Sequence, residues 1–271
     1  MKQLFWCSLL LISSIAAENE RSSKSKISLI IDLKRTPTSS STPTPTFVIS
    51  GKDAKGITYQ PFKGTPSRGQ NNPICKTYAE YAADIHEILS HKWRIIRLYG
   101  IDCNAVDVVL NLIDGKGVKL IVGVADRTVH TIASNGTTVS SQMSLHDQTK
   151  SLIQQVKNRW DLIQYVTVLD HPTTEFGYSV GLVASSVQTV KSLVPKKIKI
   201  TVPDDWTAYY THPDLCHVGQ DFLTAAVEPV YYSVGVEGAG PLVLSSRKNV
   251  SDTCHRKDVQ IVGYSPAPDL S

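Results

Sequence analysis

The sequence lacks the features of several common protein classes. After an apolar run from Leu4 to Ile15, no run reaches the roughly 18 residues that a membrane-spanning helix needs. It has no glycine-rich nucleotide loop (GxGxxG or P-loop), and no CxxC or histidine-rich spacing that indicates zinc. The net charge of +4 is mild, and no Lys/Arg cluster contains interleaved aromatic residues. We therefore expect no cofactor, no metal and no nucleic-acid partner.

The N-terminal apolar run is predicted to belong to a signal peptide over residues 1–17. Lys2 precedes the run, and Ala16-Ala17 supplies small residues before the polar Glu18, which is the usual order of a secretory signal. A buried N-terminal helix is the alternative interpretation. Export favours a secreted or cell-wall protein that has no membrane anchor once the signal is removed.

Two further segments are predicted before the folded domain. Residues 18–35 are interpreted as a propeptide that ends at the dibasic pair Lys34-Arg35, with an ordinary surface charge pair as the alternative. Residues 36–54 are predicted to be a linker, because residues 36–46 (TPTSSSTPTPT) are rich in Ser, Thr and Pro and cannot form a core.

Cysteine usage agrees with export. Cys7 lies in the predicted signal peptide, which leaves Cys75, Cys103, Cys216 and Cys254. An even number of cysteines in an exported chain predicts two disulfides, and spacing alone allows three pairings.

Two N-glycosylation acceptors are also present. They are Asn135-Gly-Thr and Asn249-Val-Ser, and they have meaning only in an exported chain. The first lies in a polar stretch over 126–143, which we interpret as a glycosylated insertion rather than a functional lid.

From about residue 55 to Ser271, apolar segments of strand type alternate with segments of helical periodicity. This alternation predicts a parallel sheet covered by helices. Strands are expected over 56–62, 94–100, 118–124, 165–169, 197–202, 229–232 (after a segment over 222–227 that leads into it) and 259–262. Helices are expected over 78–91, 105–113, 145–160 and 179–194.

A closed (β/α)8 barrel is favoured over an open doubly wound sheet, because the open sheet would usually carry a glycine-rich turn after its first strand. About seven strand–helix units are present, and the sequence stops just after the seventh strand. We therefore predict an incomplete TIM-type barrel over residues 55–271, in which the eighth unit is missing or is supplied by another segment.

Several segments together resemble glycoside hydrolase family 17, the fungal cell-wall β-1,3-glucanases and glucan transglycosylases. Residues 95–103 (IIRLYGIDC) match the family pattern viRLYGxDC, and residues 56–61 (GITYQP), Cys75, residues 119–124 and residues 213–216 (PDLC) also fit. The resemblance covers about residues 55–265 and implies a (β/α)8 barrel that faces glucan. It also implies the disulfide pairs Cys75–Cys103 and Cys216–Cys254.

The family hydrolyses glucan with two glutamates, and in a retaining enzyme their carboxyl groups lie about 5 Å apart. The acid/base glutamate belongs to a VxVGNE segment at the end of the fourth strand. Here residues 166–172 read VTVLDHP, so that Leu169, Asp170 and His171 replace the glycine, asparagine and glutamate.

The second glutamate, the nucleophile, belongs to an ITESGWP segment at the end of the seventh strand. Gly263 takes that position here, and Glu228 replaces the family's histidine after the sixth strand. Because both glutamates are replaced and the chain stops early, we interpret it as a degenerate, C-terminally short member.

Three residues remain as candidates for substitute chemistry. Asp170, His171 and Glu228 could form a new acid/base group, since a histidine near a carboxylate exchanges a proton near neutral pH. The alternative is that His171 is a polar loop residue with no partner. Glu175 is a less favoured replacement for the acid.

Substrate contacts are expected at Tyr59, Arg97, Tyr99 and Tyr231. The resemblance places Arg97 and Tyr99 on a strand that lines the family's cleft, although Arg97 could also be a buried structural cation. Further aromatic residues that could stack on sugar rings, or belong to the core, are Trp206, Tyr209, Tyr210 and Tyr232.

Three functions follow from these observations. The first is a β-glucan-binding or wall-associated protein with lost or strongly reduced catalysis. The second is an active β-1,3-glucan hydrolase or transglycosylase that uses substitute residues. The third is a protein-interaction module or a truncated product, whose open barrel edges between the first and seventh strands would favour self-association.

Overall fold

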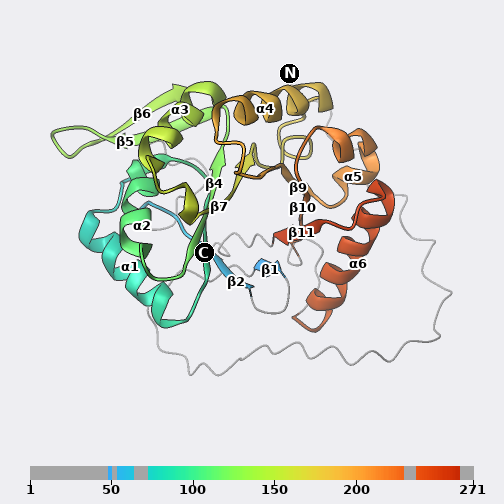
Figure 1. Ribbon diagram of the computed structural model, residues 1–271, viewed down its shortest axis with the longest axis horizontal. Helices are drawn as coiled ribbons and strands as arrows, with labels where there is room; N and C mark the ends of the chain where they lie inside the picture. The colour runs from blue at the N-terminus through green and yellow to red at the C-terminus, as the bar shows by residue number, and fades with distance from the viewer. Residues whose placement is uncertain (1–47, 51–53, 64–72, 229–235, 263–271) are drawn as a thin grey trace, which may run out of the picture. The chain divides into compact units, whose positions relative to one another are not determined.

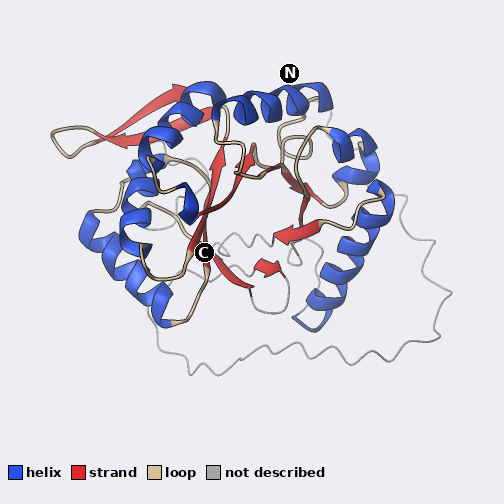
Figure 2. Cartoon of the chain, viewed as in Figure 1, coloured by secondary structure: helices blue, strands red, loops and turns tan. Residues whose placement is uncertain are grey.

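The computed structural model describes residues 48–50, 54–63, 73–228 and 236–262. Strands and helices alternate along most of this chain, and the helices lie outside the strands (Figures 1 and 2). The strands are β1 (Val48–Ser50), β2 (Ala54–Thr58), β3 (Ile95–Leu98), β4 (Lys119–Val124), β5 (Arg127–Ile132), β6 (Thr138–Met143), β7 (Ile163–Val168), β8 (Ile200–Thr201), β9 (Pro203–Asp205), β10 (Leu223–Ala226) and β11 (Val259–Val262). The α-helices are α1 (Tyr78–Ser90), α2 (Ala105–Ile113), α3 (Leu145–Val156), α4 (Val180–Leu193), α5 (Ala208–Thr211) and α6 (Val236–Cys254).

The strands form an incomplete parallel barrel, as predicted. One sheet has the order β1-β2-β3-β4-β7-β8 and another has the order β11-β10-β9. Only Val202 separates β8 from β9, so that one continuous segment pairs with β7 on one side and with β10 on the other. From β2 round to β11 all neighbouring strands are parallel.

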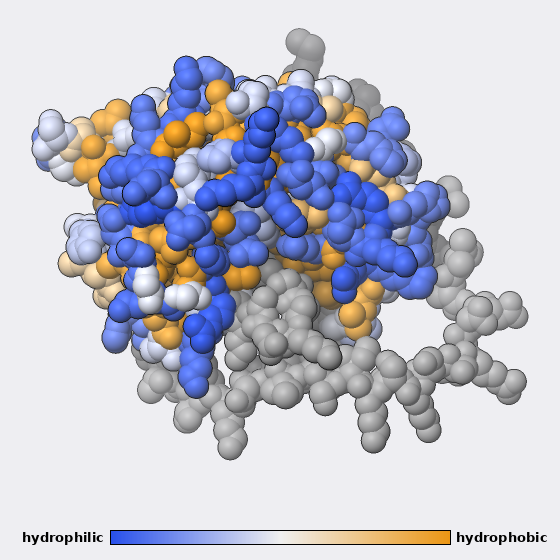
Figure 3. All heavy atoms as spheres, viewed as in Figure 1, coloured by the Kyte–Doolittle hydropathy of each residue, from blue (hydrophilic) through white to orange (hydrophobic). Residues whose placement is uncertain are grey.

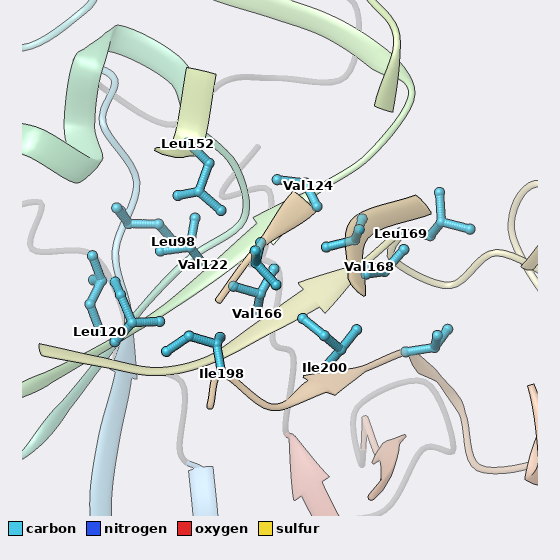
Figure 4. Close-up of a cluster of buried hydrophobic side chains, with 14 of the residues drawn as sticks. Leu98, Leu120, Val122, Val124, Leu152, Val166, Val168, Leu169, Ile198 and Ile200 are labelled. Atoms are coloured by element: carbon cyan, nitrogen blue, oxygen red, sulfur yellow. The ribbon is translucent and has the colours of Figure 1, made fainter. Parts of the chain in front are cut away.

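The two faces of these strands differ in composition. The outer face and the helices share one large apolar core (Figure 4), to which β3, β4, β7 and β8 contribute Leu98, Leu120, Val122, Val124, Val166, Val168 and Ile200. The alternate residues lie on the inner face, where Ile121, Tyr165 and Phe222 form a small separate cluster. Because successive side chains of a strand point to opposite faces, the polar Arg97 and Thr167 also lie on the inner side.

Several helices begin where the sequence provides a capping side chain. Thr77 and Glu80 form a reciprocal capping box at the start of α1. The side chains of Ser144 and Ser179 accept hydrogen bonds from the first turns of α3 and α4. Such caps fix the start of a helix and stabilise it by about 1 kcal/mol.

The polar stretch after β4 forms the antiparallel β5–β6 hairpin, which projects from the barrel (Figure 1). The sequence does contain the Asn135-Gly136 pair that favours a hairpin turn, and Asn135 accepts hydrogen bonds from both the backbone N–H and the hydroxyl of Thr137. The buried Asp102 fixes the base of the hairpin, because its carboxylate accepts from the Arg127 guanidinium at 2.6 Å and from the His130 N–H at 2.9 Å.

Other element boundaries differ from those expected. β1 lies inside the range predicted as linker, where Val48 and Ile49 supply β-branched residues suited to a strand. α3 ends at Val156, because Lys157 adopts a left-handed φ of 58°. The segment 229–232, expected to be strand, lies outside the described residues.

Two disulfides connect the outer elements, with the pairing that the family resemblance implies. Cys75, just before α1, is bonded to Cys103, just after β3. Cys216 is bonded to Cys254 at the end of α6. None of the helices that the structure describes is long and apolar enough to cross a membrane. On the face shown in Figure 3, polar side chains cover much of the described surface, with apolar side chains between them.

Candidate functional site

The loop that follows β7 is held by the strands on both sides of it. The Leu169 N–H donates to the Val124 carbonyl at the end of β4 (2.8 Å), and the His171 N–H donates to the Pro203 carbonyl on β9 (2.9 Å). Leu169 and His171 have φ values of 63° and 49°, a left-handed conformation that costs a non-glycine residue about 1–2 kcal/mol. The surrounding hydrogen bonds therefore maintain a strained backbone at the point where the family resemblance places the acid/base residue.

Asp204 on β9 fixes the next part of this loop. Its side chain is fully buried. One carboxylate oxygen accepts from the N–H of Thr173 (2.9 Å) and from its hydroxyl (2.7 Å), and the other accepts from the Thr174 hydroxyl (2.7 Å). Asp204 thus holds the segment that connects His171 to Glu175.

Arg97 connects β3 to the same loop. Its guanidinium lies 3% exposed on the inner side of the barrel and donates to the Asp170 carboxylate at 3.0 Å. The guanidinium also lies 4.4 Å from the centre of the Tyr99 ring. Asp170 therefore balances the charge of a buried arginine, which is a structural task different from proton donation to a glycosidic oxygen.

His171 and Glu228 approach each other across the ends of β7 and β10. The distance from His171 Nε2 to Glu228 Oε1 is 3.8 Å, which is too long for a hydrogen bond but short enough for a Coulombic interaction. Both side chains are buried, at 11% and 4% exposure. Among the described residues, Glu228 Oε1 has no hydrogen-bond partner.

The pKa of Glu228 is raised to about 8, mainly by burial and then by the carboxylates of Glu175, Asp205 and Asp170, while Arg97 opposes this shift. Glu228 is therefore protonated at neutral pH, and its contact with His171 is not an ion pair between two charged groups. A carboxyl group that keeps its proton near pH 7 has the property that a general acid needs.

A cavity of about 220 Å³ opens at the carboxyl ends of β2, β3, β4 and β7. In barrels of this type, the loops after the carboxyl ends of the strands form the functional face. The cavity combines carboxylates with aromatic rings, and the Phe176 and Tyr178 rings lie 5.7 Å apart, with Phe176 60% exposed. Its lining residues are Gln60, Tyr99, Ala125, Asp126, Arg127, Leu169, Asp170, His171, Glu175, Phe176 and Tyr178.

A larger cavity of about 610 Å³ lies outside the barrel, between α1, α2, α3 and the β5–β6 hairpin. Its lining includes none of the predicted site residues, so we place the candidate site at the smaller cavity. Within the described ranges, no group of three or more His, Cys, Asp or Glu side chains is arranged to bind a metal ion.

The predicted site residues separate into three groups. Asp170, His171 and Tyr99 line the cavity, Arg97 supports it through Asp170, and Glu228 lies behind His171. Tyr59 is not among the lining residues, because its hydroxyl donates to Asp84 at 2.8 Å and its side chain is buried. Tyr231, Tyr232 and Gly263 lie outside the described residues.

Apart from Tyr99, the aromatic residues of the cavity were not those expected. Tyr209 is buried and donates to the Thr224 carbonyl at 3.0 Å, which makes it a core residue. Trp206 and Tyr210 pack edge to face, with their centroids 5.8 Å apart, and neither lines the cavity. Sequence reasoning missed Phe176 and Tyr178. Their position a few residues after β7, the fourth parallel strand, could have indicated them as residues of the functional face.

The chain belongs to the BtgE/BtgC glycoside hydrolase domain family, whose model matches residues 56–265. It is 28% identical over 212 residues to the probable family 17 glucosidase SCW10 of Saccharomyces cerevisiae, covering 77% of this chain and 49% of that protein. It is 26% identical over 211 residues to the cell surface mannoprotein MP65 of Candida albicans, covering 75% of this chain and 49% of that protein. The chain thus spans about half the length of these relatives.

The probable β-glucosidase btgE of Neosartorya fischeri is also similar, at 26% identity over 75% of this chain and 34% of that protein. Among solved structures, the chain is similar to a glycoside hydrolase family 17 β-1,3-glucanosyltransferase from Rhizomucor miehei, with a TM-score of 0.57 and 20% identity. That match covers 76% of this chain and 69% of the other, and it establishes the shared barrel fold.

Proposed function

We propose that this protein binds β-1,3-glucan at the carboxyl ends of its barrel strands, and that it has lost or strongly reduced the two-glutamate hydrolysis of its family. The observation that carries this proposal is the end of β7. Asp170 there pairs with the buried Arg97, and a strained His171 takes the position of the acid/base glutamate.

Sugar binding is supported by the composition of the cavity. The exposed Phe176 ring and the adjacent Tyr178 provide an apolar surface for the C–H faces of a pyranose ring. Glu175, Asp126 and Gln60 provide polar groups for its hydroxyls. Glucan is proposed as the ligand because the chain belongs to this glycoside hydrolase family and shares its fold with a β-1,3-glucanosyltransferase.

A secreted, wall-associated location is part of the same proposal. It is supported by the N-terminal apolar run, by the two disulfides and by the relative named as a cell surface mannoprotein. Asn135 is exposed at the turn of the β5–β6 hairpin, whereas Asn249 is half-buried within α6. We therefore propose Asn135 as the glycosylated position.

Two measurements on the purified, disulfide-intact protein test this function. We expect no release of reducing ends from soluble β-1,3-glucan above a boiled control, together with retention on insoluble β-1,3-glucan and no retention on cellulose. Phe176→Ala is expected to weaken retention about three- to tenfold, the size of one aromatic contact. Tyr78→Ala is the matched control, because Tyr78 is also 60% exposed but lies on α1.

If Phe176→Ala leaves retention on glucan unchanged, glucan does not bind at this cavity. A protein that binds no wall polysaccharide would contradict glucan binding itself.

An active enzyme with substitute residues is the second candidate, and the high pKa of Glu228 is the observation that favours it. Glu228 would then act as the acid beside His171. Reducing-end release that disappears in Glu228→Gln and in His171→Ala would establish this candidate. The 3% exposure of Glu228 counts against it, because a general acid must reach the glycosidic oxygen.

A further inference from the structure

The parallel strands leave one position open around the barrel. Seven parallel positions follow one another in the described residues: β2, β3, β4, β7, the continuous β8–β9 segment, β10 and β11. A TIM-type barrel has eight. The eighth position lies between β11 and β2, and both neighbouring strands would present unpaired backbone N–H and C=O groups if it were empty.

β1 lies in this position. It pairs with β2 in antiparallel fashion, with Val48 opposite Gly56, Ile49 opposite Lys55 and Ser50 opposite Ala54. It also contacts β11, the seventh parallel strand, and Figure 1 shows β1 between β2 and β11.

The antiparallel direction follows from the short connection. A parallel strand at this position would need a crossover of a dozen or more residues, whereas an antiparallel neighbour needs only a hairpin. Only three residues separate the end of β1 from the start of β2 in the sequence, which is too few for a crossover.

We propose that residues 48–50 serve as the eighth strand of the barrel and keep the protein monomeric, by pairing with the edge of β2 and lying against the edge of β11. The barrel is then closed by residues 48–50, which lie just before β2. Composition assigns these residues to the predicted linker. Cleavage after Arg35 would leave this strand attached, whereas cleavage after Ser50 would remove it.

Truncation tests the effect on association. A chain that begins at Thr36 is expected to be monomeric by light scattering and to unfold at the same temperature as the full chain. A chain that begins at Lys52 is expected to form dimers or larger species and to unfold about 5 °C lower. A Lys52 chain that stays monomeric with an unchanged midpoint would overturn the proposal.

Cross-linking in the full chain tests the position of β1 without removing it. The double variant Ile49→Cys/Lys55→Cys places cysteines at two directly paired backbone positions, whose Cα separation of about 4.5–5.5 Å a disulfide can span. Ser50→Cys/Lys55→Cys is the control, because Ser50 is paired with Ala54 and not with Lys55. Peptide mapping is expected to find the new disulfide in the first variant alone, and equal yields in both would contradict the register.

Discussion

The surroundings of Glu228 strongly alter its ordinary chemistry. Burial and three neighbouring carboxylates raise its pKa to about 8 in the folded protein, against 4.5 for a free glutamate side chain. Folding therefore favours the protonated form. This contribution to stability is fully present below about pH 4.5, and it is lost as the pH rises through about 8. The total loss is on the order of 5 kcal/mol.

Glu228→Gln is accordingly expected to flatten the decline in stability between pH 5 and about 8.5, because the amide never ionises. The free energy of unfolding from denaturant titrations across this range measures the effect. Asp161→Asn is a suitable control, since Asp161 is exposed and its side chain lies in no described ion pair. An unchanged pH slope in the Glu228 variant would show that this carboxyl is ionised in the folded protein.

The family motifs predict which residues stand at this site, but not the contacts that these residues make. That His171 takes the position of a glutamate remains a prediction from the motifs. That Asp170 pairs with Arg97, 73 positions earlier in the chain, depends on the parallel register of β3, β4 and β7. The same is true of Asp204 and its three hydrogen bonds to Thr173 and Thr174, because residues about 30 positions apart meet only after the strands have paired.

At the level of elements, the buried parallel strands could be predicted best. β3 is apolar except for Arg97 and β4 is apolar after Lys119, as is typical of strands covered on both faces. The β5–β6 hairpin was missed, because its residues are mostly polar and partly exposed, and its position depends on contacts with Asp102 rather than on burial of its own apolar face.

Gly123 on β4 shows how closely the strands approach at the site. A Cβ at this position would lie 2.4 Å from the Tyr99 carbonyl and 3.1 Å from the Thr167 hydroxyl. Gly123→Ala must therefore displace the end of β3, where Tyr99 lines the cavity. We expect it to destabilise the protein by about 1–3 kcal/mol and to weaken retention on β-1,3-glucan.

Gly181→Ala is the matched control for this change, because a Cβ there meets nothing within 4 Å and the residue lies in α4. It is expected to leave binding unchanged and to stabilise the protein by up to about 1 kcal/mol. Thermal unfolding and glucan retention, measured side by side, distinguish the two variants. Equal behaviour would mean that the contact between β4 and Tyr99 does not position the site.

For the whole molecule, the sequence left open whether an eighth barrel unit is missing or is supplied by another segment. Counting strand–helix units led to seven, and composition assigned the residues before them to a linker. A strand of three residues carries almost no periodicity, so β1 is identified by its pairing with β2 and not by its own pattern. The pairing of the strands therefore indicates the segment at the eighth position, which composition did not.

The two disulfides connect the outer elements of the barrel and tie its stability to an oxidising compartment. They span 28 and 38 positions of sequence, for which loop closure predicts about 3.5 and 4 kcal/mol of stabilisation. Cys75→Ala/Cys103→Ala and Cys216→Ala/Cys254→Ala are each expected to lower the free energy of unfolding by a similar amount. Denaturant titration of the two variants, with the intact protein as reference, measures both effects.

Reduction of both disulfides in the intact protein is expected to lower the free energy of unfolding by more than the loss of either pair alone. The folded state should then survive only in an oxidising compartment. Unfolding midpoints that do not respond to a reducing agent would instead mean that the apolar core between strands and helices is sufficient. In that case the cysteines would no longer support the proposal of a secreted protein, which would then rest on the N-terminal run and on the relatives alone.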